Sequence, residues 1–149
     1  MTPMQQLFLG QGSKQLTFID DVFSTYVYTG NSTARSINNG IDFSKGAMVW
    51  TKTRSAAYHH NLFDTVRTNG RTHALASSGN TGAGNYGTDG ITSFNSNGFS
   101  LGTDTMGALN DNNKTYSSWS FAKSKGFFTC LTYVGNGNNR QISHDLSCV

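Results

Sequence analysis

Apolar and polar residues alternate along much of this chain in short runs that turn-forming residues separate. In Phe23–Thr29, for example, Phe23, Thr25 and Val27 occupy every second position. Successive side chains of an extended strand point to opposite faces, so alternation of this kind is typical of a half-buried β-strand. The pattern therefore predicts a strand over Phe23–Thr29.

The same pattern predicts further strands at Ala47–Lys52, Asn61–Arg67, Thr72–Ala76, Ile91–Phe94, Phe99–Leu101, Tyr116–Ala122 and Phe127–Val134. The sequence Asn95-Ser96-Asn97-Gly98 is typical of a tight turn, so the strands beside it should form a hairpin. Ser77–Gly90 and Gly102–Lys114 lack strand character and are expected to be loops. Many short strands without an amphipathic helix favour an all-β sandwich or barrel.

The composition is that of an ordered β protein with few charges. Apolar residues make up 36% of the sequence and charged residues 13%, while the net charge is +3. The basic clusters are small, whereas a nucleic-acid-binding domain carries a denser basic stripe. No apolar run is long enough to span a membrane, and the first 20 residues lack the features of a signal peptide. We therefore expect synthesis in a cytoplasm without classical secretion, no membrane insertion and no nucleic-acid partner.

Part of the sequence recurs near the C-terminus. Phe23, Tyr28, Gly30, Asn31, Arg35 and Ile37 recur, at the same spacing, as Phe128, Tyr133, Gly135, Asn136, Arg140 and Ile142. Such self-similarity indicates repeated structural units. We expect a sandwich domain over residues 22–134, followed at 135–149 by the start of a second repeat. That start would either complete the first sandwich or contact a neighbour.

Residues 1–21 differ from the rest of the chain. They include Met4, Leu7, Phe8 and Leu9, which so short a segment cannot bury by itself. Chain ends are ordered only when they are tied down. Two interpretations follow, a packing arm laid on its own domain or an extended arm that anchors the protein to another subunit. We adopt the anchoring arm as the prediction.

Residues suited to catalysis or metal binding are not suitably arranged. His59 and His60 are adjacent, so in a strand they would point to opposite faces. Asp104, Asp111 and Asn113 share a loop but lack the spacing of a calcium-binding loop. No paired carboxylates or nucleophile turn can be recognised. We therefore predict a non-enzymatic protein without a metal or cofactor, and leave open whether Cys130 and Cys148 pair.

Loop aromatic and imidazole groups are better suited to contact than to catalysis. Tyr58, His59, His60 and Tyr86 lie in or near predicted loops. Flat aromatic rings can pack against sugar rings or protein partners. We predict these residues as ligand contacts, with half-buried packing as the alternative for each.

Several stretches together resemble repeats in tailed-phage virion proteins, notably those of marine phages. The matching stretches are Asp21–Asn31, Ile37–Asp42, Val49–Ala56, Leu62–Thr65, Thr92–Phe99, Tyr116–Phe121 and Thr132–Leu146. The resemblance implies an antiparallel β-sandwich of the jelly-roll, lectin-like type, related to concanavalin and laminin-G domains. It covers nearly the whole chain but carries no catalytic residues.

The resemblance also implies a role in the virion. The expected protein is a tail fibre or tail-associated component whose lectin-like module attaches to a host-surface glycan. The alternative is a capsid decoration or cement-type protein without glycan binding. Its expected partners are other virion proteins, reached through the N-terminal arm, and further copies of itself, with a trimer favoured. Its expected location is the virion, assembled in the host cytoplasm.

Overall fold

The computed structural model describes residues 17–68, 70–80, 84–104 and 106–147. Its described elements are α2 (Ile19–Val22), β1 (Phe23–Thr29), β2 (Arg35–Asn38), β3 (Ala47–Thr53), β4 (Asn61–Asp64), β5 (His73–Ala76), β6 (Gly84–Asn85), β7 (Ile91–Asn95), β8 (Gly98–Leu101) and β9 (Thr115–Ala122). Strands predominate, and no helix among the described residues has the length and apolar character needed to cross a membrane. The predicted anchoring residues Met4, Leu7, Phe8 and Leu9 lie outside the described residues.

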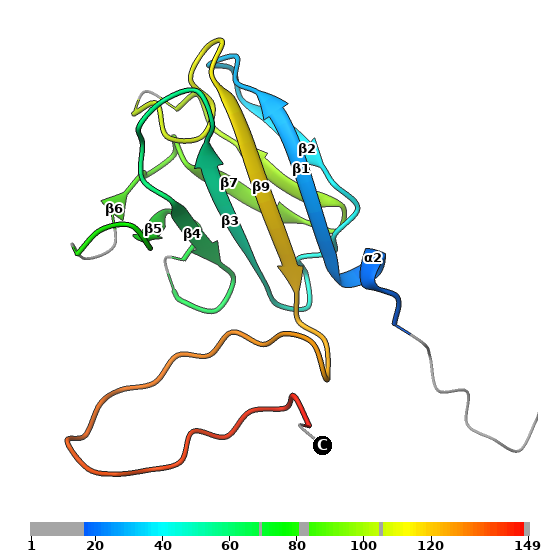
Figure 1. The fold of residues 1–149 in the computed structure, drawn as a ribbon, viewed down its shortest axis with the longest axis vertical. Helices are drawn as coiled ribbons and strands as arrows, with labels where there is room; N and C mark the ends of the chain where they lie inside the picture. Colours follow the sequence, from blue (N-terminus) through cyan, green and yellow to red (C-terminus); the bar gives the residue numbers. More distant parts are fainter. Residues whose placement is uncertain (1–16, 69, 81–83, 105, 148–149) are drawn as a thin grey trace, which may run out of the picture.

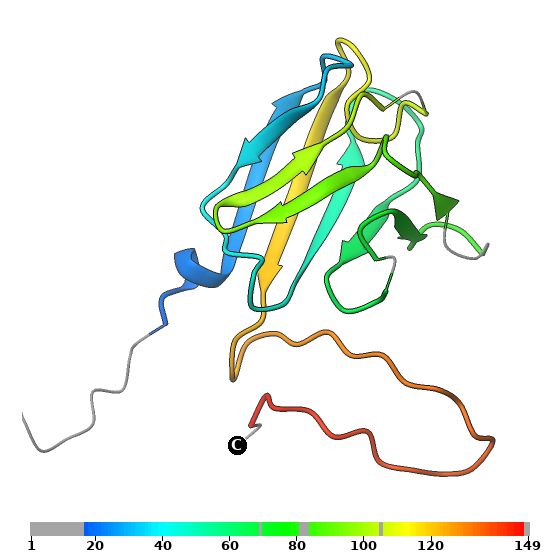
Figure 2. The ribbon, with the colours of Figure 1, turned by 180° about the vertical axis from the view of Figure 1, so that it is seen from behind.

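The described strands form two antiparallel sheets that pack face to face. The larger sheet has the strand order β1-β9-β3-β4-β5-β6, and Figure 1 views it from its outer side. The smaller sheet has the order β2-β8-β7 and lies in front in the opposite view of Figure 2. Paired strands run antiparallel throughout both sheets. The predicted all-β antiparallel sandwich is therefore confirmed.

The core lies between the two sheets and is built from alternate residues of the strands. β3 follows the rule strictly, because Ala47, Val49, Thr51 and Thr53 are buried while the residues between them are partly exposed. The largest buried side chains of the core are Tyr116, Phe43, Phe63, Phe99, Ile41, Ile91, Leu101 and Leu109. Removing this apolar surface from water is the main force that holds the two sheets together.

The hairpin predicted around Asn95–Gly98 is present. β7 and β8 pair with Asn95 opposite Gly98, so Ser96 and Asn97 form the turn. Gly98 has a φ of 128°, a conformation that residues with a side chain rarely adopt. A Cβ at this position would also lie 2.0 Å from the carbonyl oxygen of Ile37. Glycine at 98 thus allows both the turn and the approach of β2.

Two strand predictions differ from the structure. The strand predicted over Asn61–Arg67 ends at Asp64, whose Oδ1 accepts the backbone N–H groups of Val66 (3.0 Å) and Arg67 (2.8 Å) and so turns the chain. The strand predicted over Phe127–Val134 is wrong. β9 pairs with β1 along one edge, from Phe23 opposite Phe121 to Thr29 opposite Thr115, and with β3 along the other. The segment that follows β9 therefore cannot fold back and pair with it.

Residues 123–147, called the arm below, leave the sandwich after β9. In both views the arm runs out beyond the end of the sheets and turns back (Figures 1 and 2). Its first residues form an isolated bridge between Ser124 and Phe128, and residues 129–147 belong to no described strand. The arm therefore does not complete the sandwich, which was one of the two roles expected for the second repeat.

Candidate functional site

A row of side chains crosses the outer face of the larger sheet. Strand register places one residue of each of five neighbouring strands in this row, namely Thr25, Trp119, Trp50, Leu62 and Leu75. We call this row the tryptophan face. The side chains of residues directly opposite one another on an antiparallel sheet are in contact range. Four of the five positions are apolar, so the row forms a continuous apolar strip.

The two indole rings lie at the centre of this face. The ring centroids of Trp50 and Trp119 are 5.5 Å apart, with the ring planes inclined by 52°. His60 lies on the other side of Trp50, with a centroid separation of 5.7 Å. Tilted packing at these distances is a favourable arrangement of aromatic rings. Each ring thus restrains its neighbour, and together they form a stiff aromatic platform.

Two buried nitrogen atoms of this platform have no hydrogen-bond partner among the described residues. They are Nε1 of Trp50 and Nδ1 of His60. Buried polar atoms in folded proteins nearly always have a partner, so an unpaired one requires an explanation. Both atoms belong to the aromatic platform, and because they are buried a bound molecule could reach either one only if a side chain of the platform moved.

In the middle of β9 the outward side chains are more apolar than the inward ones, although Tyr116 and Ala122, which also point inward, belong to the core. The inward residues Ser118 and Ser120 are fully buried, whereas the outward residues Trp119 and Phe121 are partly exposed. Asn39 donates a hydrogen bond to Ser120 (2.7 Å), which makes the burial of that hydroxyl tolerable. A sheet with one solvated face normally shows the opposite pattern. This reversal marks the outer face as a contact surface.

The four predicted contact residues do not form one site with this face. Only His60 touches the tryptophan face directly. Nδ1 of His59 is 3.2 Å from the Ser78 hydroxyl, and His59 is exposed. Tyr58 is exposed too, and its hydroxyl lies over Gly107.

Tyr86 is mainly a packing residue. Its ring packs edge-on against Phe63 at 5.7 Å, and its hydroxyl donates to Oδ1 of Asn61 (3.1 Å). The pKa of the Tyr86 hydroxyl is raised above its usual range, mainly because the group is partly buried. Half-buried packing, which was the alternative for each predicted contact residue, therefore describes the environment of Tyr86.

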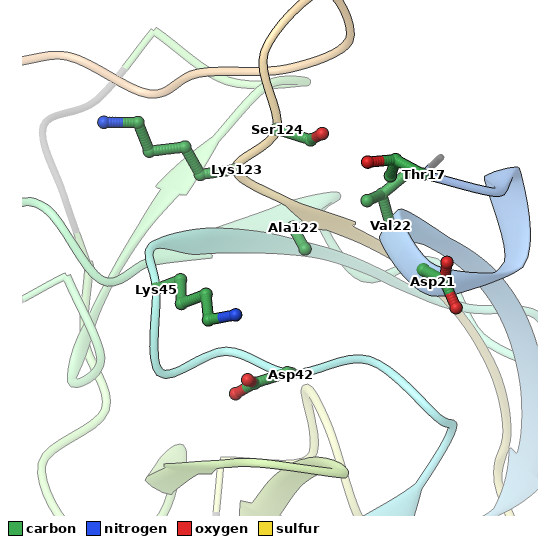
Figure 3. A pocket seen from close by; sticks show the side chains of 8 residues that line it. All are labelled: Thr17, Asp21, Val22, Asp42, Lys45, Ala122, Lys123 and Ser124. Carbon is green, nitrogen blue, oxygen red and sulfur yellow. The ribbon is translucent and has the colours of Figure 1, made fainter. Parts of the chain in front are cut away.

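A polar pocket of about 340 Å³ lies at the end of the sandwich where the arm begins. It is lined by Thr17, Asp21, Val22, Asp42, Lys45, Ala122, Lys123 and Ser124, which come from α2, the link before β3 and the end of β9 (Figure 3). Ser44, through its hydroxyl and its backbone N–H, lowers the pKa of Asp42. Lys123 forms an ion pair with Asp145 at 2.9 Å. Two of the charged lining groups thus already have partners.

The Asp104 carboxylate, part of the loop weighed above for calcium, has a structural role. It is buried and accepts backbone N–H groups of Ala108 (3.1 Å), Leu109 and Asn110. These bonds use the oxygens that a calcium ion would need. Among the described residues, no three His, Cys, Asp or Glu side chains come together as a metal site would require.

A family model matches residues 20–127, the part of the chain that contains every strand described above. The model is described as a domain of unknown function, DUF7483. The chain belongs to the DUF7483 family. No curated protein and no solved structure matches it. The tryptophan face and the polar pocket lie within or at the edge of the DUF7483 domain, whereas most of the arm follows the matched range.

Trp50 and Trp119 were not predicted as a site from the sequence. Each was assigned correctly to a strand, and alternation showed which residues share its face. Only the pairing of β3 with β9, which are far apart in the sequence, places the two rings side by side. The signal in the sequence that could have pointed to this face is that both tryptophans of the chain lie within predicted strands.

Proposed function

We propose that this protein is a non-enzymatic structural component of a tailed-phage virion, a tail fibre or tail-associated protein. In this proposal the DUF7483 sandwich is a lectin-like module that attaches to a host-surface glycan. The observation that carries the binding role is the tryptophan face, a partly exposed aromatic strip on the outer side of the larger sheet. The assignment to a phage virion rests on the sequence resemblance described above.

The chemistry of the tryptophan face suits a sugar. Pyranose rings present apolar C–H faces, and indole rings offer a flat apolar surface against which such faces pack. Specific binding also needs a few polar groups close to the apolar surface. The exposed Thr25, directly opposite Trp119 on the sheet, offers such a group in its hydroxyl. A glycan is therefore the ligand class that the composition of this face favours.

Intrinsic fluorescence provides a direct test of glycan binding. The chain contains two tryptophans, and both lie on the tryptophan face. Titration with oligosaccharides from bacterial surface polysaccharides should change the fluorescence of the wild-type chain in a saturable way. The Trp50→Phe and Trp119→Phe variants each retain a single indole and show which ring responds.

Substitutions separate the face from the loops. Trp119→Ala should abolish binding, whereas Leu131→Ala, which removes an exposed apolar side chain from the arm, should not. His59→Ala and Tyr86→Ala test the loop residues in the same assay. Attachment through this module is the wrong interpretation if arrayed polysaccharides give no saturable signal with the wild type. It is also wrong if Trp119→Ala, His59→Ala and Tyr86→Ala all bind as the wild type does. A thermal unfolding curve for each variant confirms that it is folded.

A capsid decoration or cement-type protein remains the second candidate, and one observation favours it. Val27 and Leu75, at the two sides of the outer face, are 63% and 45% exposed and are purely aliphatic. Aliphatic side chains suit a protein partner better than a sugar. In that case deletion of Met1–Gly12, the proposed anchor, should abolish incorporation into particles, and the glycan titration should be silent. Normal incorporation of the deletion variant would exclude this role.

A further inference from the structure

The arm repeats the conformation of the β1–β2 connection, not only its sequence. In the sandwich, the Arg35 guanidinium lies 5.3 Å from the centre of the Tyr28 ring and donates to the carbonyl oxygen of Thr29. In the arm, the Arg140 guanidinium lies 5.0 Å from the centre of the Tyr133 ring and donates to the carbonyl oxygen of Val134. Every partner in the arm is the repeat counterpart of the partner in the sandwich.

The turn between the two strands is repeated as well. Oδ1 of Asn31 accepts the backbone N–H of Thr33 at 3.1 Å, and Oδ1 of Asn136 accepts that of Asn138 at 3.1 Å. The residue after each asparagine is left-handed, with φ of 51° at Ser32 and 74° at Gly137. Residues 128–142, called the arm hairpin below, thus reproduce the local geometry of the connection between β1 and β2.

The first copy fills a place in the sandwich that the second copy lacks. Tyr28 is buried, stacks on Tyr116 at 5.2 Å and donates to the carbonyl oxygen of Leu109 at 2.9 Å. Its counterpart Tyr133 is 68% exposed. Ile37 is buried under β8, whereas its counterpart Ile142 is exposed. The arm hairpin thus carries side chains suited to a place that β1 and β2 already fill in the described sandwich.

Gly135 gives the clearest sign that the arm hairpin is built to dock. A Cβ on its counterpart Gly30 would lie 2.1 Å from the carbonyl oxygen of Asp111, so the sandwich requires glycine there. Nothing lies within 4 Å of the corresponding position at Gly135, and its φ is not positive. Glycine costs conformational entropy without any local benefit at such a site. Glycine would be needed at position 135 only if the arm hairpin were docked on a sandwich in the way that β1 and β2 are.

We propose that the arm hairpin docks on the β8–β9 edge of a second copy of this domain, in the place that β1 and β2 occupy. We call that edge, together with the 108–114 loop, the socket. The described residues contain two such segments and one socket, which β1–β2 fills. The arm hairpin can therefore dock only where a second DUF7483 domain has its own β1–β2 displaced or absent, and such a domain offers the equivalents of Tyr116 and Leu109. Docking of this kind would join DUF7483 domains head to tail, independently of any glycan.

The test mixes the wild-type chain with a full-length receptor variant. The receptor carries Tyr28→Ala, which weakens the docking of its own β1–β2, and Gly135→Ala, which disables its own arm. Sedimentation should show a 1:1 complex with the wild-type chain and a monomer for the receptor alone. A folded receptor that stays monomeric when mixed with wild-type chain at high concentration would overturn the proposal.

In this mixture the wild-type chain is the donor of the arm hairpin. Two variants of the donor make the comparison specific. Gly135→Ala should weaken the complex by about tenfold or more, because the added Cβ meets a backbone oxygen in the socket. Gly137→Ser should leave the complex unchanged, since Ser32 occupies the same left-handed position in the sandwich. Equal binding by the wild-type and Gly135→Ala donors would contradict docking in the β1–β2 place.

A second protein keeps the proposal testable if the receptor does not fold. In this fusion, residues 39–122 are appended directly after Ser143 of the full chain, so the appended copy has no β1–β2 of its own. Amide NMR spectra should show two folded domains, and Gly135→Ala should unfold the appended copy alone. An appended copy that stays unfolded beside a native first domain would refute the proposal.

Discussion

Gly30 lies against Asp111 so closely that a Cβ built on Gly30 would be 2.1 Å from the Asp111 carbonyl oxygen. The approach is fixed on both sides, because Gly30 donates to the carbonyl oxygen of Lys114 (2.7 Å) and accepts the N–H of Asn113 (3.1 Å). These bonds join the end of β1 to the loop that precedes β9. The contact therefore closes one end of the sandwich.

Gly30→Ala should destabilise the domain strongly. Relief of the clash requires the loop to move and these backbone bonds to lengthen, for which we expect a loss of about 2–4 kcal/mol. Urea denaturation followed by circular dichroism measures the loss. Gly135→Ala is the matched control, because its Cβ has open space, and it should change the free energy of unfolding by less than about 0.5 kcal/mol. Equal losses for the two variants would contradict the geometry.

Much of the fold could be predicted from the sequence, because alternation is a local property. Thr115–Ala122 shows it in full, with every second residue buried, and its strand was predicted almost to the residue. β2 could not be recognised in this way, since Ile37 is its only buried residue. The strand expected at Phe127–Val134 has the right alternation but pairs with no strand of either sheet. Alternation thus reports that a segment can be a strand, whereas pairing decides whether it is one.

The candidate site was much less predictable. The loop residues were chosen because exposed aromatic groups often contact ligands, a criterion that ignores strand register. Trp50 and Trp119 become neighbours only through the β3–β9 pairing, and the sequence does not specify which strands are adjacent. The role of Asp104 could not be predicted either, because its partners are backbone N–H groups, which every residue except proline has.

Asp104→Ala should be among the most damaging substitutions in the chain. It would leave three buried backbone N–H groups without an acceptor, each of which costs about 1–3 kcal/mol. The 108–110 segment also holds β1, because Leu109 accepts the Tyr28 hydroxyl. We expect the variant to be largely unfolded at 37 °C, as measured by calorimetry.

Asp104→Asn provides the graded comparison. Asparagine has the same shape and tolerates the left-handed conformation found at this position, where φ is 57°. It keeps one acceptor oxygen but loses the charge, so its loss of stability should be clearly smaller than that of Asp104→Ala. An alanine variant as stable as the asparagine variant would show that the carboxylate does not hold the loop.

Cys130 should react slowly with thiol reagents. The pKa of its thiol is raised, mainly because the group is partly buried. A raised pKa lowers the share of thiolate, which is the reactive species. At pH 8 we expect the native chain to react with Ellman's reagent roughly threefold to tenfold more slowly than the urea-unfolded chain. Cys148→Ser should be present in both samples, so that only Cys130 is measured. Equal rates in the native and unfolded chains would show that the arm does not shield the thiol.

The fold should lose stability at alkaline pH because two stacked tyrosines are buried. Burial raises the pKa of Tyr116 to about 12 and also raises that of Tyr28, whereas an unfolded tyrosine titrates near 10. Above pH 10 the unfolded chain releases protons that the native chain still holds, so the free energy of unfolding falls as pH rises. The stabilisation is complete below pH 10 and is lost as pH approaches 12, by up to about 1.4 kcal/mol per pH unit for each tyrosine.

Urea denaturation at pH 9 and pH 11 tests this dependence. Tyr116→Phe should be less stable than the wild type at pH 9, because its hydroxyl donates to the carbonyl oxygen of Gly107 (3.1 Å) and accepts the N–H of Asp111 (3.0 Å). The same variant should lose less stability between the two pH values, since one titrating group has been removed. Tyr133→Phe is the matched control in the arm, where the ring is exposed, and should show the wild-type dependence. If Tyr116→Phe and the wild type lose the same free energy over this interval, another group governs the alkaline transition.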